Sequence, residues 1–168
     1  MPDEKLIKEI RRGYTLSWRG IHGVTHWARV LENGSRLSVL TGARLSIVRL
    51  FAVFHDSRRI NEDHDPNHGR RGASLAADLR GEFFEMSDED FALLRIACSD
   101  HTGGKTDGDV TVQTCWDADR LDLGRVGIRP HPDHLCTQAA KDPATISWAY
   151  QRSITNFVPG FVMAEWEA

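Results

Sequence analysis

The apolar run LSIVRLFAVF, Leu45–Phe54, limits the choice of fold more than any other stretch of the chain. Hydrophobic side chains occupy nearly every side of a helix drawn through it, interrupted only by Ser46 and Arg49, and this is typical of a helix buried in the centre of a domain. The run ends abruptly in His55 and Asp56. A core helix has no need of an imidazole and a carboxylate at its end, whereas a metal site needs such groups. The run therefore predicts a central helix with metal ligands at its carboxyl end.

Helical periodicity recurs along most of the chain. Ser87 is suited to cap a helix that begins with acidic residues, and Gly42 and Gly81 are suited to follow the ends of helices. We expect further helices over residues 3–18, 24–40, 68–79, 86–101, 115–127 and 143–157. Strand signals are few, and Asp109–Gln113 carries the best of them. The prediction is an all-α domain.

The length of 168 residues suits a single domain over residues 1–168, with enough chain for a hydrophobic core. The formal charge of -3 gives no general attraction to nucleic acid or to an anionic membrane. Three widely spaced cysteines, none in a CxxC pair, argue against a disulfide framework and fit a reducing compartment. The sequence contains neither a signal-peptide core nor a run of roughly 20 apolar residues that could span a membrane. We therefore expect a cytoplasmic protein, and nothing in the sequence argues against a homo-oligomer.

Four imidazole and carboxylate groups form a candidate ligand set: His26, His55, Asp56 and Asp117. Such nitrogen and oxygen donors suit divalent ions such as manganese, iron, nickel, zinc, cobalt or magnesium. Better known metal and nucleotide motifs do not fit. HGVTH lacks the glutamate of a zinc-protease helix, DHDPNHG lacks the glycine and glutamate of an EF-hand loop, and neither a P-loop nor GxGxxG is present.

Five motifs follow one another along the chain: HGVTHWARV, FAVFHDSRR, NHGRRGA, SDHTGG and WDADRLDLGR. In this order they resemble the HD-domain superfamily of metal-dependent phosphohydrolases. The resemblance covers about residues 22–125 and leaves a C-terminal helical extension after residue 130. It implies an all-helical bundle, and it assigns the superfamily's H…HD…D metal ligands to His26, His55, Asp56 and Asp117.

The resemblance also implies a second metal position. His68 and His101 stand where members with two metals carry two further histidines, so Asp56, His68 and His101 would bind a second ion, with Asp56 bridging the pair. One or two divalent ions per chain are therefore expected. Two such ions can bind a phosphoryl oxygen and lower the pKa of a bridging water, and the hydroxide formed in this way would be the nucleophile. Asp56 would thus be central to catalysis.

Two arginines, Arg58 and Arg59, follow the HD pair where many members of the superfamily carry a lysine. Arginine offers a planar donor fork for phosphate, so both are candidate phosphate ligands, and Arg59 is also a candidate catalytic residue. His22 and His64 are candidate substrate contacts. The candidates for the general acid are Glu62, Asp63, His64 and Asp65. The resemblance implies a small phosphate ester or anhydride as substrate, with a nucleotide as the default.

Several alternatives stay open at this point. Residues two apart on a helix point roughly 200° apart, so only one of Asp117 and Asp119 can face the pocket. We expect Asp117 there, with Asp119 facing solvent or pairing with an arginine. Arg29 forms either a salt bridge to a buried carboxylate or a substrate contact. As to function, some HD-fold proteins hold two irons with the same ligands and cleave C–C or C–P bonds with oxygen, and others would sense a nucleotide without catalysis.

Overall fold

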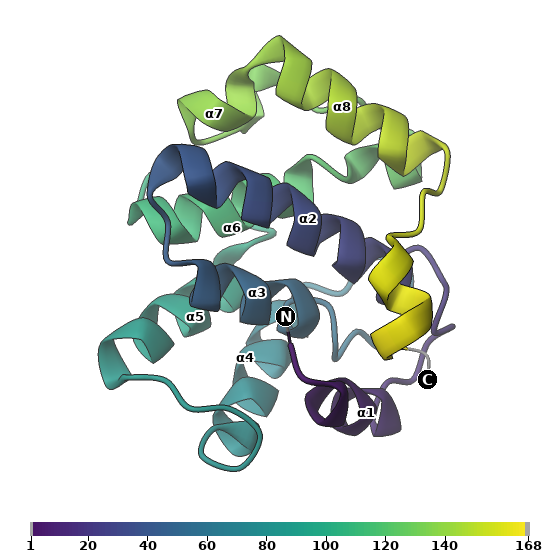
Figure 1. The fold of residues 1–168 in the computed structure, drawn as a ribbon, viewed down its shortest axis with the longest axis vertical. Coiled ribbons are helices and arrows are strands. Elements are labelled where there is room, and N and C mark those ends of the chain that lie inside the picture. The colour runs from purple at the N-terminus through teal and green to yellow at the C-terminus, as the bar shows by residue number, and fades with distance from the viewer. Residues whose placement is uncertain (1, 167–168) are drawn as a thin grey trace.

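Residues 2–166, the part of the chain that this computed structural model describes, form eight α-helices and three 3-10 or π-helical segments, joined by loops (Figure 1). Within these residues there is no strand, only an isolated bridge between Arg80 and Phe84. The prediction of an all-α fold is confirmed. In chain order the α-helices are α1 (Glu4–Arg12), α2 (Val24–Thr41), α3 (Leu45–Phe54), α4 (His68–Leu79), α5 (Asp88–Asp100), α6 (Val110–Arg120), α7 (Gln138–Lys141) and α8 (Pro143–Ile154).

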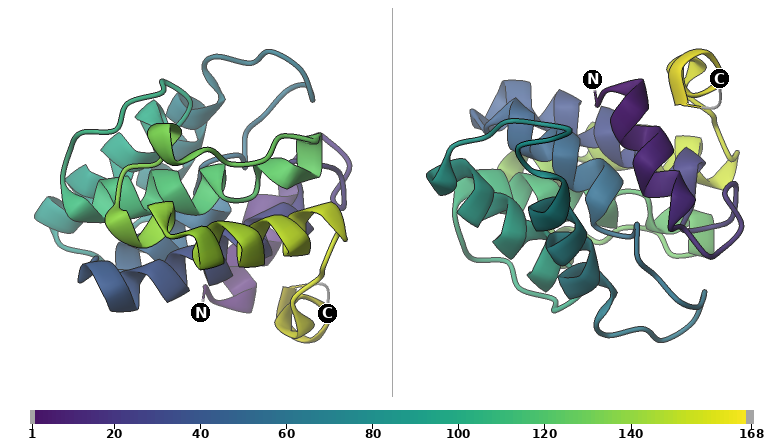
Figure 2. Two further views of the ribbon diagram at one scale, coloured as in Figure 1. Left: turned by 90° about the horizontal axis from the view of Figure 1, so that it is seen from above. Right: turned by 90° about the horizontal axis from the view of Figure 1, so that it is seen from below.

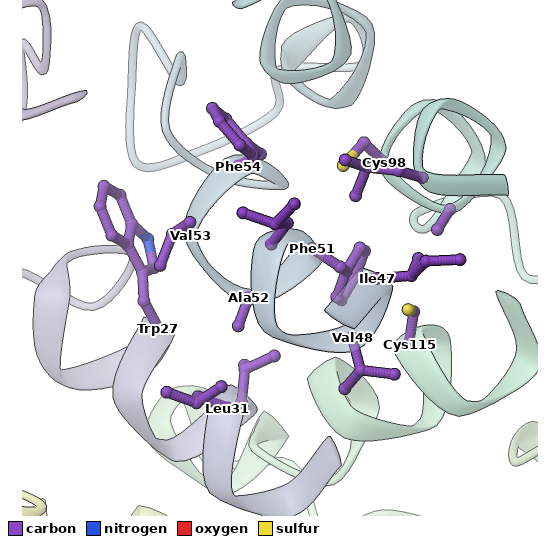
Figure 3. Packing of buried hydrophobic residues seen from close by; sticks show 14 of the residues in the cluster. Trp27, Leu31, Ile47, Val48, Phe51, Ala52, Val53, Phe54, Cys98 and Cys115 are labelled. Atoms are coloured by element: carbon purple, nitrogen blue, oxygen red, sulfur yellow. The ribbon is translucent and has the colours of Figure 1, made fainter. Parts of the chain in front are cut away.

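Helix α3 lies at the centre of the molecule, as its sequence predicts. It packs against α2, α5 and α6, and its side chains fill the core on several sides (Figure 3). Ile47 and Phe51 face α5 and α6 near Cys98 and Cys115, whereas Val53 lies toward Trp27 of α2. All of these side chains are fully buried. The apolar stretch therefore holds the next residues, His55 and Asp56, on a rigid support.

Three of the helices around α3, namely α2, α4 and α5, begin and end close to the expected residues. Helix α2 runs through Gly34 and ends at Gly42, whose φ of 76° is the left-handed conformation that glycine adopts most readily. Helix α5 begins after Ser87, whose side chain accepts a hydrogen bond from the backbone N–H of Asp90. Helix α4 packs along α5 and extends over the predicted residues 68–79.

Three sequence-based predictions are wrong in detail. The helix expected over residues 115–127 is α6, which begins at Val110 and ends at Arg120, and a short 3-10 segment, η1 (Leu123–Val126), follows it. The first helix ends at Arg12 and not at residue 18, and Tyr14 and Trp18 pack on the core from the loop that follows. The strand expected over Asp109–Gln113 is instead the start of α6. There the side chain of Asp109 accepts a hydrogen bond from the N–H of Thr111 and caps the helix.

The C-terminal part covers one side of the bundle. Helices α7 and α8 lie over α2 and α6, as seen from above in Figure 2. They close a second, smaller hydrophobic cluster, formed by Leu37, Leu121, Leu135, Ala140, Ile146 and Ala149. The chain then returns to α1, where the π-helical segment η3 (Val162–Trp166) packs beside the first helix (Figure 1). The assignment of the whole chain to one domain stays a prediction. None of the helices in the described residues is long and apolar enough to cross a bilayer.

Candidate metal centre

Five helices bring a group of histidines and aspartates together at the centre of the bundle. Most of these residues lie at a helix end: His55 and Asp56 follow α3, His68 begins α4 and His101 follows α5. His26 and a sixth residue, Asp119, come from the bodies of α2 and α6. The histidines and Asp56 are at most 4% exposed. The packing of the helices thus places ionisable groups where water has little access.

The first ligand group consists of His26, His55 and Asp56, whose ligand atoms lie within 4.8 Å of one another. The Nε2 atoms of His26 and His55 are 3.0 Å apart. Oδ2 of Asp56 lies 3.6 Å from the first nitrogen and 3.7 Å from the second. Oδ1 of Asp119 lies 3.4 Å from Nε2 of His26 and 3.8 Å from Nε2 of His55. With Asp119 added, the first ligand group therefore has two nitrogen and two oxygen donors.

The second ligand group consists of Asp56, His68 and His101 and meets the same distance limit. Here the other carboxylate oxygen of Asp56, Oδ1, lies 3.0 Å from Nε2 of His68 and 3.7 Å from Nε2 of His101. The two Nε2 atoms are 2.8 Å apart. Asp56 thus directs one oxygen to each group, which is the arrangement expected of a bridging carboxylate.

Backbone contacts fix the orientation of three of the four imidazole rings. Nδ1 of His55 lies 3.1 Å from the carbonyl oxygen of Phe51, and Nδ1 of His101 lies 2.7 Å from that of Cys98. Nδ1 of His68 contacts the carbonyl oxygen of Asp65. A carbonyl can only accept, so each Nδ1 carries a proton, and a neutral ring then has its lone pair at Nε2, where a cation can bind. The same tautomer is selected in many metal sites by hydrogen bonds of this kind.

His26 receives the corresponding support from Asp122, a residue that the sequence analysis did not single out. Its Oδ2 lies 2.7 Å from Nδ1 of His26. The same carboxylate accepts hydrogen bonds from Nε and Nη2 of Arg29 at 2.7 and 3.0 Å, and Arg29 is only 2% exposed. The salt-bridge interpretation of Arg29 is confirmed. The three-residue spacing between Asp119 and Asp122, which places both on one side of the chain, was the signal available in the sequence.

The charges of the site follow from its burial and its composition. Burial lowers the pKa of His55 to about 3, so this ring is neutral. Burial alone would raise the pKa of Asp56, but the surrounding histidines, His55 first, bring it well below its usual range. The pKa of Asp119 is lowered against the effect of burial by His26, His55 and Arg125. Both carboxylates are therefore ionised.

These donors fit a divalent cation. Oδ1 of Asp56 and Oδ1 of Asp119 are buried atoms without a hydrogen-bond partner among the described residues. A buried polar atom without a partner destabilises the fold by about 1 to 3 kcal/mol, and adjacent lone pairs repel each other as well. A cation in each group would satisfy both oxygens and all four Nε2 atoms. Nitrogen and oxygen donors without sulfur suit manganese, iron, nickel, zinc, cobalt or magnesium.

The expectation for Asp117 has to be corrected. Its carboxylate accepts hydrogen bonds from the backbone N–H groups of Cys136 and Thr137, at 2.6 and 2.8 Å, and from the hydroxyl of Thr137 at 2.8 Å. It is buried, and it anchors the segment before α7 instead of facing the histidines. Asp119 takes the place beside the histidines because two residues correspond to roughly 200° of helical turn. Asp119 also lies 3.8 Å from Nη2 of Arg125.

The two arginines after the HD pair point in different directions. Nη1 of Arg58 donates to the carbonyl oxygens of Ile10 and Ser57, at 3.0 and 2.9 Å, so this side chain holds the end of α1 and does not reach the ligand groups. The expected phosphate contact of Arg58 is therefore corrected. Arg59 does lie at the site, with Nη1 3.6 Å from Oδ1 of Asp56 and 3.2 Å from both ring nitrogens of His68.

The remaining candidates lie around the rim. His22 is hydrogen-bonded to the carboxylate of Glu62, burial lowers its pKa, and its ring centroid is 6.5 Å from that of His26. His64 is exposed and lines a cavity of about 350 Å³ next to the second ligand group, together with Asp63.

Asp65 is unsuited to the role of general acid. Its carboxylate accepts hydrogen bonds from Arg71 and from the N–H of Ile60 and fixes the loop, and these contacts outweigh burial and lower its pKa. Glu62, Asp63 and His64 remain as the candidates.

The ligand groups open into a cavity of about 280 Å³ that Asp56, His68, His101 and Asp119 line together with three arginines. A larger cavity of about 600 Å³ lies over α4 and α5 and touches none of the ligand residues. The cavity of about 280 Å³ and the adjoining one of about 350 Å³ beside His68 are therefore where a substrate would meet a bound cation.

No protein-family model and no curated protein matches the chain. Among solved structures, the chain is similar to a predicted HD superfamily hydrolase from an uncultured Thermotogales bacterium, with 22% identity and a TM-score of 0.67. The similarity extends over 96% of this chain and 91% of the other. At this identity the likeness concerns the fold. Together with the observed helices, it shows that the chain has the HD-domain fold that its histidines and aspartates predicted.

Proposed function

We propose that the chain is a metal-dependent phosphohydrolase that acts on a small phosphate ester or anhydride. The observation that carries the proposal is the pair of buried ligand groups that share Asp56. The likeness to a predicted hydrolase of the same fold supports it. The arginines of the adjoining cavity add donors suited to phosphate oxygens.

His26, His55, Asp56 and Asp119 would hold one cation, and Asp56, His68 and His101 would hold the other. When bound, such cations supply Lewis acidity and lower the pKa of a coordinated water. Arg59 places a guanidinium nitrogen beside Asp56, where it would orient a phosphoryl group. The hydrogen-bonded pair of His22 and Glu62 lies next to His26 and would hold a proton for the leaving group.

Elemental analysis of metal bound to the wild type, Asp56→Ala and Asp119→Ala tests the proposal, followed by a panel of phosphate esters and anhydrides. We expect up to two divalent ions per chain, a loss of both in Asp56→Ala and a loss centred on the first group in Asp119→Ala. Hydrolysis should require the metal. No bound ion after reconstitution with manganese, nickel or zinc would contradict the metalloenzyme.

The same experiments separate the two alternatives. Two irons with oxygen consumption, and no phosphatase activity, would indicate an HD-fold oxygenase. Tight nucleotide binding without hydrolysis under any metal would indicate a sensing domain.

A further inference from the structure

Three arginines line the cavity over the ligand groups, and one of them is fully engaged in holding the fold. Nη1 of Arg120 donates to the carbonyl oxygen of His134 at 3.0 Å, and Nη2 donates to that of Lys105 at 2.6 Å. The guanidinium also lies over the ring of Trp116. Arg120 therefore joins two loops to α6 and has little capacity left for a ligand.

Arg125 is held differently. Its Nε donates to the carbonyl oxygen of Ile21 at 2.9 Å and its Nη1 to that of Asp122 at 3.1 Å. Nη2 lies 3.8 Å from Oδ1 of Asp119, too far for a hydrogen bond, and it has no other partner among the described residues. The side chain is only 7% exposed. Backbone contacts thus fix the guanidinium while one nitrogen stays unused at the edge of the first ligand group.

Arg59 is held in the same way at the second ligand group. Its Nη2 donates to the carbonyl oxygen of Asp63 at 2.7 Å, and its Nε donates to that of Asn61 at 3.3 Å. Nη1 faces His68 and Asp56. Each arginine is therefore fixed by two backbone carbonyls and directs one Nη to an aspartate of the site, Arg59 to Asp56 and Arg125 to Asp119.

We propose that Arg125 and Arg59 form a two-sided anion clamp, and that the clamp with its cavity selects a small phosphate compound without a nucleobase. This inference rests on the proposed function, because it names the substrate class of the same site. The two guanidinium groups balance the charges of Asp56 and Asp119. Any divalent cation then leaves the cavity with net positive charge, which favours a phosphate dianion.

The lining of the cavity carries the second half of the proposal. Its volume is about 280 Å³. Apart from the histidines, no aromatic side chain of the described residues lines it, and Leu123 is its one large apolar residue. The adjoining cavity of about 350 Å³, which shares Arg59, His68 and Thr102 with it, also has no aromatic lining among these residues apart from histidines. Proteins commonly hold a nucleobase by stacking on aromatic rings, and neither cavity offers such a surface. Polar donors dominate instead, which suits a compact and highly charged molecule.

Isothermal titration of inorganic phosphate into manganese-loaded protein tests the clamp without turnover. Arg125→Gln should bind phosphate about tenfold to a hundredfold more weakly than the wild type, because a hydrogen bond to a charged group is lost. Arg125→Lys keeps the charge and should recover part of the affinity. Arg95→Gln is the matched control, since Arg95 is exposed on α5 and lies outside this cavity. Metal content and thermal unfolding of each variant verify that the site and the fold persist.

Unchanged phosphate affinity in both Arg125 variants would overturn the clamp, and so would a wild type that does not bind phosphate. If Arg125→Gln does not fold, Arg125→Lys and Arg59→Lys carry the test, each with an expected loss of affinity.

Competition by glycerol phosphate and by a nucleoside monophosphate tests the substrate class. Glycerol phosphate should compete more strongly than the nucleoside monophosphate, and a nucleotide that binds as tightly as glycerol phosphate or more tightly would overturn the exclusion of a base. Phosphate binding that depends on Arg125 but without hydrolysis of any ester would leave the clamp standing and reject the phosphohydrolase.

Discussion

Two aspartates on α6, separated by one residue, have different roles. Asp117 accepts three hydrogen bonds from Cys136 and Thr137, whereas Asp119 has a buried oxygen without a partner beside His26. Rotation about the helix axis separates them, so one carboxylate contributes to stability and the other to the site. The two side chains are chemically identical, and only their surroundings differ.

This contrast predicts opposite effects of two matched substitutions. Asp119→Ala should reduce the number of metal ions bound per chain while the melting temperature of the metal-free protein changes little. Asp117→Ala should lower the free energy of unfolding by about 2 to 4 kcal/mol, because it leaves buried donors without an acceptor. Elemental analysis and thermal unfolding of both variants measure these effects. Equal loss of metal in the two variants, with equal stability, would contradict the assignment.

Asp122 is expected to act on the metal through His26. Asp122→Asn keeps the shape of the side chain but weakens the hold on Nδ1 of His26, and metal affinity should fall about tenfold to a hundredfold. Asp122→Ala should in addition destabilise the fold by about 3 to 5 kcal/mol, since Arg29 would be left buried and unpaired. Metal titration and chemical unfolding separate the two effects. If Asp122→Asn bound metal with wild-type affinity, the role of Asp122 would be limited to pairing with Arg29.

The residues of the site could be predicted from the sequence more readily than the orientation of their side chains. The pattern of His26, His55, Asp56, His68 and His101 marked groups that the structure does bring together. The choice between Asp117 and Asp119 depends on the rotation of α6, which the sequence of one helix does not define. The direction of Arg58 depends on α1, whose last carbonyl groups it meets. Both errors concern contacts between distant parts of the chain.

At the scale of the elements, helix ends that carry local signals were predicted well. The cap of α5 by Ser87 and the end of α2 at Gly42 depend on a few neighbouring residues. The strand predicted for the segment VTVQT was wrong. Its β-branched residues are typical of a strand. The cap by Asp109 and the burial of Val112 and Cys115 on one face favour the helix instead. Local propensity was outweighed by packing against α2 and α5.

Helix α4 approaches its neighbours closely enough to require glycine. A Cβ atom on Gly72 would lie 2.1 Å from the carbonyl oxygen of Phe54, and one on Gly69 would lie 2.1 Å from that of Cys98. Gly72→Ala should therefore destabilise the protein by about 1 to 3 kcal/mol, although alanine favours helices. Metal affinity should fall too, since α4 carries His68. Ser74→Ala, exposed on the same helix, is the control and should change stability by less than about 0.5 kcal/mol. A stabilised Gly72→Ala variant would contradict this packing.

At the scale of the whole molecule, the ligand groups tie together helices that are distant in the sequence. The six residues come from α2, α6 and the ends of α3, α4 and α5. A cation that binds only the folded chain should therefore raise the melting temperature, by about 5 to 10 °C at a hundredfold excess over Kd. A thermal unfolding series with manganese and with a chelator measures the shift. Asp56→Ala should show almost none, and an equal shift in that variant would indicate binding elsewhere.

The anchoring of the imidazole rings has a consequence for the rate at which metal is exchanged. The Nδ1 atoms of His55, His68 and His101 are held by carbonyl groups three or four residues earlier in the chain, so the backbone itself aims these rings. These rings are therefore oriented when the chain folds, so that binding of an ion carries no further entropic cost for them. It also needs no rearrangement of the helices. The amide chemical shifts of the metal-free and metal-loaded protein should therefore differ only for residues near the pocket. Replacement of one metal by another would be limited by ligand dissociation and not by opening of the bundle.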